Sequence, residues 1–121
     1  MTEALVIDDN RNTADALVGM LEMLGLGARP AYGSSAAMAL LQTLTPSLIL
    51  LDVNMPGVDG LEVLAYLNRE PRLKAVPVIV ITSDDQPETK QRVLENGAES
   101  LIVKPASLAT LEPILKKVGV L

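Results

Sequence analysis

The feature that most constrains the fold is a series of short, continuous apolar runs that alternate with amphipathic stretches. Four strong runs occupy residues 4–7, 48–51, 78–81 and 101–103. A weaker run at residues 28–32 is interrupted by Pro30, and proline within a sheet is tolerated mainly at an edge. Continuous apolar runs are typical of strands that are buried on both faces of a parallel sheet. The pattern therefore predicts an α/β fold with a five-stranded parallel sheet.

Five helices are expected, one after each strand. After the first strand, apolar residues recur at helical spacing, as Ala14, Leu17 and Leu21 do. The fourth helix, from about 87 to 96, is largely polar, and Pro113 should kink or break the fifth because it removes a helical hydrogen bond. The expected boundary residues are Gly25 and Gly27 after the first helix, Ser34 or Ser35 before the second, Asp59 before the third, Gly97 after the fourth and Ser107 before the fifth.

The composition excludes several kinds of function. A net charge of −5 argues against direct binding of nucleic acid, which requires a basic face. The chain has no cysteine and no histidine, so any thiolate or imidazole chemistry must come from a partner. Acidic residues near the N-terminus exclude a signal-peptide core, and the apolar runs are too short to span a bilayer. We expect one cytoplasmic domain over residues 1–121, without a membrane partner.

Polar residues follow four of the five predicted strands. They are Asp8 and Asp9 after the first strand, Asp52 after the third, Thr82 and Ser83 after the fourth, and Lys104 and Pro105 after the fifth. Each has an ordinary structural explanation, since acids cap helices, threonine favours strands and lysine–proline pairs occur in loops. In a parallel sheet, however, residues that follow the strands lie on one edge, where ligands bind. The strand ends therefore bring three carboxylates, hydroxyl groups and one ammonium together.

Three carboxylates at one edge require positive charge. They repel one another unless a cation lies among them, and Lys104 supplies only one charge. A hard divalent ion with oxygen ligands, by preference Mg2+, would offset the remaining charge. An acidic cluster with a lysine and a hydroxyl at strand ends is typical of a phosphoryl site.

These residues and their order resemble the response-regulator receiver family. The matching segments are Asp8-Asp9 after an apolar run, Asp52 in Leu-Asp-Val-Asn-Met-Pro-Gly, Thr82 after Val-Ile-Val-Ile, and Lys104-Pro105 after Gly97-Ala98. The resemblance covers the whole chain. It implies a flavodoxin-like, doubly wound (βα)5 fold with strand order 2-1-3-4-5, and a function in two-component or phosphorelay signalling.

The resemblance also implies an acceptor and a metal site. Asp52 matches the residue that accepts a phosphoryl group from a histidine kinase or His-phosphotransfer protein. Asp9, Asp52 and the backbone carbonyl of Asn54 match the Mg2+ ligands, and Asp8 matches an acid that reaches the metal through water. Self-phosphorylation and slow self-dephosphorylation are the only reactions implied, so the protein is not expected to be an enzyme.

Two further residues are expected to respond to the phosphoryl group. By resemblance, the Thr82 hydroxyl and the Lys104 ammonium contact its oxygens, and the Lys104-Pro105 peptide bond is cis. The added charge would bias the face formed by the fourth helix, fifth strand and fifth helix, through charge-assisted hydrogen bonds. A downstream protein target is implied, but the residues do not identify it.

The chain departs from the family on that same face. Leu101 and Ala106 occupy positions where aromatic residues are common, and Pro113 also lies there. The aromatic switch is therefore absent or replaced, and Leu101 is interpreted as a core aliphatic residue. Because these residues depart from the family, the resemblance does not imply any particular mode of dimerisation. The polar residues of the fourth helix are expected to be solvated: Glu88, Lys90, Gln91, Arg92 and Glu95.

Three other functions compete with that of a phosphorylated receiver. An aspartate-dependent phosphatase would need an acid two positions after Asp52, where this chain has Asn54. A flavin-binding module would need aromatic residues and a phosphate loop, whereas Asp8 and Asp9 would repel phosphate. A degenerate receiver used only for protein docking is disfavoured because every phosphorylation residue is present, although Leu101 keeps it open.

Overall fold

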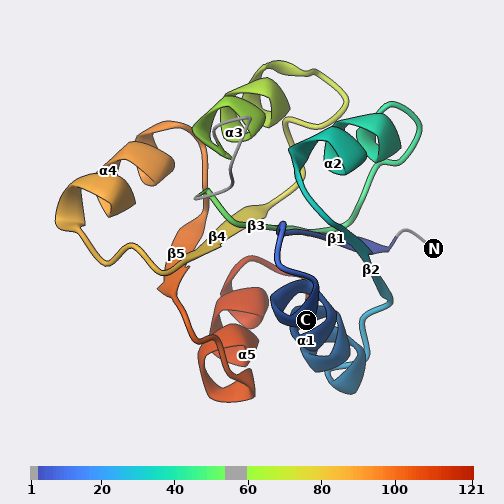
Figure 1. Ribbon diagram of the computed structural model, residues 1–121, viewed down its shortest axis with the longest axis vertical. Coiled ribbons are helices and arrows are strands. Elements are labelled where there is room, and N and C mark those ends of the chain that lie inside the picture. The colour runs from blue at the N-terminus through green and yellow to red at the C-terminus, as the bar shows by residue number, and fades with distance from the viewer. Residues whose placement is uncertain (1–2, 54–59) are drawn as a thin grey trace.

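A single parallel sheet forms the centre of the molecule (Figure 1). The computed structural model describes residues 3–53 and 60–121, and five strands occur within these ranges in the order β2-β1-β3-β4-β5. The strands are β1 (Ala4–Ile7), β2 (Ala28–Ala31), β3 (Ile49–Leu51), β4 (Val78–Thr82) and β5 (Ser100–Val103). The predicted flavodoxin-like strand order is confirmed, and β2, which contains Pro30, lies at an edge as predicted.

Helices cover both faces of the sheet. They are α1 (Arg11–Met23), α2 (Ser34–Leu41), α3 (Gly60–Arg69), α4 (Pro87–Glu95) and α5 (Leu108–Lys117). In Figure 1, α1 and α5 lie on one face, and α2, α3 and α4 lie on the other. Each face has its own aliphatic cluster, with Leu17, Leu50 and Leu111 in one and Leu41, Leu64 and Val80 in the other. No helix of the described residues is long and apolar enough to cross a bilayer.

The helix caps agree only partly with the predictions. The Ser107 hydroxyl accepts a hydrogen bond from the Thr110 backbone N–H, so Ser107 caps α5, which begins where the sequence predicted. The predicted cap of α2 at Ser34 or Ser35 is wrong, because Gly33 is the N-cap residue and Ser34 is the first helical residue. Gly33 has φ 107°, a backbone conformation that glycine adopts without strain.

Asn10 provides the cap of α1. Its side chain accepts a hydrogen bond from the Thr13 backbone N–H, so neither preceding acid is the N-cap residue. The predicted turn at 55–57 and the predicted cap residue Asp59 lie outside the described residues.

Of the two predicted effects of Pro113, the break does not occur, because α5 continues from Leu108 to Lys117 with Pro113 inside it. The predicted kink stays a prediction. Pro113 removes the backbone donor for the carbonyl of Ala109, four residues earlier. Both residues are exposed, so water can hydrogen-bond to that carbonyl. Leu111 and Leu115, which are buried on the inner side, keep the helix packed against the sheet.

Candidate functional site

Three carboxylates meet at the carboxyl ends of β1 and β3. Asp8 and Asp9 follow β1, and Asp52 follows β3, which lies beside β1 in parallel register. The Asp52 backbone N–H donates to the Ile7 carbonyl at 2.9 Å, so the sheet hydrogen bonding continues up to the acid. One oxygen from each carboxylate lies within 4.8 Å of the others. Asp8 and Asp52 are buried, at 1% and 6% exposure, whereas Asp9 is exposed.

Lys104 provides positive charge within this cluster. Its Nζ donates to Asp8 Oδ2 at 3.0 Å and to Asp52 Oδ2 at 3.2 Å. Burial by itself lowers the pKa of Lys104, but its hydrogen bonds and the charges of Asp8 and Asp52 outweigh that effect and raise the pKa above its ordinary value. The ammonium therefore stays charged and pairs with two acids. The peptide bond from Lys104 to Pro105 is cis, as the resemblance implied.

Thr82 ends β4, the strand between β3 and β5, at the same edge of the sheet. Its side chain is completely buried, and its carbonyl accepts from the Lys104 backbone N–H at 2.7 Å. Its Oγ1 accepts a hydrogen bond from the Asp84 backbone N–H at 3.2 Å. The fold thus brings Asp8, Asp9, Asp52 and Lys104 into one cluster and places Thr82 at the same sheet edge. Asn54 lies outside the described residues.

Asp84 forms contacts that were not predicted from the sequence. Its Oδ1 accepts from the Gln86 backbone N–H at 2.9 Å, and its Oδ2 accepts from Thr89 Oγ1 at 2.6 Å. The bond from Thr89, followed by the bond from Gln86, holds the pKa of Asp84 below its ordinary value. The available signal was an acid three residues before Pro87, which can begin a helix.

The acidic cluster fits a magnesium ion. Carboxylate oxygens are ligands that Mg2+ prefers, and it is usually held by one or two protein carboxylates together with water and phosphate oxygens. Asp8, Asp9 and Asp52 together exceed the single charge of Lys104, so the cluster retains negative charge for a cation to offset. The exposed side chain of Asp9 can reach an ion that is still partly hydrated.

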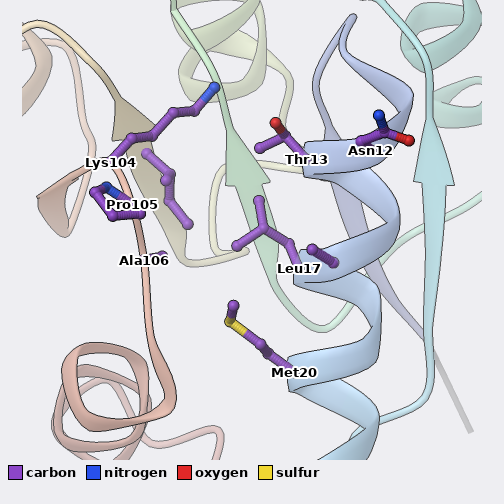
Figure 2. A pocket seen from close by; sticks show the side chains of 9 residues that line it. Asn12, Thr13, Leu17, Met20, Lys104, Pro105 and Ala106 are labelled. Carbon is purple, nitrogen blue, oxygen red and sulfur yellow. The ribbon is translucent and has the colours of Figure 1, made fainter.

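A groove of about 490 Å³ runs beside the site along α1 (Figure 2). Its walls come from α1 on one side and from the segment after β5 on the other, and Lys104 forms one end in Figure 2. The small side chains of Ala16 and Ala106 help to keep it open. The lining residues are Asn12, Thr13, Ala16, Leu17, Met20, Ile81, Lys104, Pro105 and Ala106.

Known proteins are similar to this chain in sequence and in fold. A family model described as the response regulator receiver domain matches residues 4–116. The phosphate regulon transcriptional regulatory protein PhoB of Pseudomonas aeruginosa is 32% identical over 119 residues, which are 95% of this chain and 52% of PhoB. Protein PilH of the same organism is 31% identical over 111 residues, covering 92% of each chain. The chain therefore spans about half the length of PhoB and nearly all of PilH.

Solved structures agree with these matches. The chemotaxis protein CheY4 of Vibrio cholerae superposes with a TM-score of 0.89 at 29% identity, covering 98% of each chain. The signal receiver domain of a DNA-binding response regulator from Colwellia psychrerythraea superposes with a TM-score of 0.90, also at 29% identity and 98% coverage of each chain.

Proposed function

The chain belongs to the response regulator receiver domain family of two-component signalling, and on that premise we propose that Asp52 accepts a phosphoryl group from a histidine kinase or His-phosphotransfer protein. The observation that carries this proposal is the buried Asp52 carboxylate, 3.2 Å from Lys104 Nζ and beside Asp8 and Asp9. A partner must supply the phosphohistidine, because this chain has no histidine.

In the proposed reaction, an Asp52 carboxylate oxygen attacks the phosphorus. An O–P bond forms on Asp52, and the P–N bond of the phosphohistidine breaks, which leaves the imidazole on the donor. The charged phosphoryl group repels a carboxylate, so nearby positive charge and in-line placement account for most of the catalysis. Lys104 supplies fixed charge within hydrogen-bonding distance of the attacking carboxylate. Mg2+, when bound, supplies further neutralisation of the phosphoryl oxygens.

The remaining residues have supporting roles in this proposal. Asp9, Asp52 and the Asn54 carbonyl would hold Mg2+, and Asp8 would orient its water. The Thr82 hydroxyl would donate to a phosphoryl oxygen, and Lys104 would pair with another. Self-phosphorylation from small donors and slow self-dephosphorylation are the only reactions proposed for the protein alone.

The groove along α1 is the proposed contact for the phosphate donor. Lys104 belongs both to the groove and to the Asp52 site, so a protein that brings a phosphohistidine to Asp52 would cover the groove at the same time. Met20, Leu17 and Ala106 offer it a largely apolar wall (Figure 2). An apolar helix face next to the phosphohistidine is therefore the proposed occupant.

The face formed by α4, β5 and α5 is the proposed output surface. Leu94 of α4 and Val103 of β5 are exposed, at 41% and 43%, and the polar side chains of α4 are exposed to solvent as predicted. Leu101 is partly buried and packs against the core cluster beneath α4, which agrees with its interpretation as a core aliphatic residue. A downstream protein would bind this face after phosphorylation.

The test of the proposal is uptake of a phosphoryl group at one residue. Wild-type protein incubated with acetyl phosphate and Mg2+ should gain one phosphoryl mass, and Asp52→Asn should gain none. Asp85→Asn is the matched control, since Asp85 is an exposed acid outside the cluster and should leave uptake unchanged. No gain in the wild type would reject the proposal and favour a receiver that acts only by docking. The same gain in Asp52→Asn would reject Asp52 as the acceptor.

A further inference from the structure

Asp84 links the candidate site to α4. Its backbone N–H donates to Thr82 Oγ1, while its carboxylate accepts from the Gln86 N–H and from Thr89 Oγ1. One residue thus contacts the last residue of β4 with its main chain and the first turn of α4 with its side chain. We refer to Thr82, Asp84, Gln86 and Thr89 as the Asp84 relay.

The relay matters because α4 is weakly packed. Val93 is the one buried residue of this helix in the described part of the chain, and Leu94 is 41% exposed. The N-cap residue Gln86 makes no side-chain cap hydrogen bond, and the Asp84 carboxylate instead holds the start of the helix by accepting from the Gln86 N–H and from the Thr89 hydroxyl. We refer to these two bonds as the Asp84 cap. Few buried apolar contacts leave a segment at the low end of local stability. We therefore expect α4 to respond to the gain or loss of one or two hydrogen bonds at its first turn.

We propose that Asp84 is a positioning residue that transmits the state of the phosphorylation site from the Thr82 hydroxyl to α4. The inference rests on the proposed function, because the Thr82 hydroxyl is the group expected to turn toward a phosphoryl group on Asp52. Thr82 Oγ1 accepts the Asp84 N–H at 3.2 Å, so moving Oγ1 either breaks this bond or draws Asp84 with it.

Either movement reaches α4 through the Asp84 carboxylate. The Thr89 hydroxyl lies 2.6 Å from Asp84 Oδ2, and a hydrogen bond to an ionised acceptor is about twice as strong as one between neutral groups. Displacing Asp84 therefore weakens the cap or carries the first turn of α4 with it. The route needs no aromatic side chain in β5, where this chain has Leu101.

The test compares hydrogen exchange of the α4 amides in Mg2+ with and without acetyl phosphate, and intact mass of the same samples reports phosphorylation of Asp52. In the wild type, phosphorylation should change α4 exchange about five-fold, the equivalent of one ordinary hydrogen bond. Thr89→Val removes the donor to Asp84 and leaves the acidic cluster untouched. It should still gain the phosphoryl mass, but its α4 response should fall to about two-fold or less.

Two further variants separate the relay from general weakening of α4. Thr89→Ser keeps a hydroxyl at the same position and should restore the wild-type response. Gln91→Ala removes a different α4 hydrogen bond, the one from Gln91 Nε2 to Glu95 Oε1 at 3.0 Å. It should raise exchange in both states and preserve the phosphorylation-dependent difference.

The possible outcomes test the Asp84 relay separately from the proposed phosphorylation of Asp52. An added phosphoryl mass with an undiminished α4 response in Thr89→Val would overturn the relay alone. Equal losses in Thr89→Val and Gln91→Ala, or no α4 response in phosphorylated wild type, would also overturn it. Absence of the phosphoryl mass in the wild type would overturn the proposed function and the relay together.

Discussion

Lys104 Nζ lies 3.2 Å from Asp52 Oδ2 although 52 positions separate the two residues in the chain. The same ammonium also contacts Asp8 at 3.0 Å, so it joins the residues that follow β1, β3 and β5. The two acids are almost fully buried. Lys104 is consequently a structural cation of the phosphate-free protein as well as a proposed ligand of the phosphoryl group.

Replacing Lys104 should make stability depend more strongly on Mg2+. Lys104→Met removes the ammonium that pairs with Asp8 and Asp52, and removing one partner of a buried ion pair costs about 3–5 kcal/mol. Urea unfolding in EDTA should show this loss, and saturating Mg2+ should restore much of it, since the metal offsets the same charge. Lys116→Met, on α5, is the control. An equal loss with and without Mg2+ would contradict this role for Lys104.

Magnesium should stabilise the protein through the acidic cluster. A ligand at about 100 times its Kd raises the free energy of unfolding by about 2.7 kcal/mol. Asp9→Asn should reduce this gain by weakening Mg2+ binding, with little effect on stability in EDTA because Asp9 is exposed. Thermal unfolding across a Mg2+ titration measures both effects, with Asp85→Asn as control. If Asp9→Asn retained the full gain, Asp9 would not be a ligand.

Replacing Gly60 even by alanine should destabilise the protein. A Cβ at Gly60 would lie 2.2 Å from Val53 Cα and 2.8 Å from the Asp52 carbonyl oxygen, so the backbone beside the proposed acceptor would have to move. Gly60→Ala should lower the free energy of unfolding by about 1–3 kcal/mol and reduce phosphoryl uptake.

Gly19→Ala provides the comparison for Gly60. Among the described residues, nothing lies within 4 Å of a Cβ at Gly19, which is inside α1. Alanine there should stabilise the protein by about 0.5–1 kcal/mol, because it favours the helix. Urea unfolding of both variants gives the two values. If Gly60→Ala and Gly19→Ala changed the free energy of unfolding alike, the close packing of Gly60 against the backbone of Asp52 and Val53 would not matter for stability.

The Asp84 cap should fail in acid. Hydrogen bonds from Thr89 and Gln86 lower the pKa of Asp84 in the folded protein, so the carboxylate contributes stability above its unfolded pKa, roughly pH 4. That contribution is lost as the pH falls through the lowered folded value. The stability difference between wild type and Asp84→Asn should stay constant from neutral pH to about pH 5 and narrow below pH 4.

Urea unfolding over a pH series measures that difference. Asp85→Asn serves as the charge-matched neighbour in the same loop. If the difference in the free energy of unfolding between wild type and Asp84→Asn instead widened as the pH fell, the ionised Asp84 carboxylate would not stabilise α4.

The groove along α1 should matter for a protein donor and not for a small one. Met20→Lys places a charge in the apolar wall and should slow phosphotransfer from a histidine kinase about ten-fold, while uptake from acetyl phosphate is unchanged. Met23→Lys, on the same helix, is the control, because Met23 is exposed and does not line the groove. A panel of histidine kinases identifies the donor for the assay. Equal slowing by both variants, or by neither, would reject the groove as the contact.

The sequence by itself determined the elements and the members of the acidic cluster. Continuous apolar runs predict buried parallel strands, because a strand covered by helices on both faces needs apolar side chains at every position. Acids and the lysine directly after those runs predict one edge, because parallel strands end together. Asp8, Asp9, Asp52 and Lys104 could therefore be named before any contact was known, and the structure brings them together.

Tertiary structure alone decided the details that depend on neighbours. Ser34 is a good capping residue in isolation, but the chain turns at Gly33 with a positive φ, so α2 begins one residue earlier. Pro113 is a helix breaker in isolation, but the packing of Leu111 and Leu115 keeps α5 continuous. Both outcomes depend on interactions with residues elsewhere in the fold, and the helix propensity of a single residue does not include those interactions.

The contacts of the candidate site also divide into those that the sequence predicts and those that only the tertiary structure decides. Lys104 could be assigned to the correct edge from the sequence, but its pairing with both Asp8 and Asp52 depends on how the loop after β5 crosses the strand ends. The two contacts of Asp84, with Thr82 and with Thr89, depend on the path from β4 to α4. Sequence determined which charges meet, because alternating strands and helices predict a parallel sheet whose strands end at one edge. Only the tertiary structure decided which atoms pair, because hydrogen bonds require positions fixed to a few tenths of an ångström.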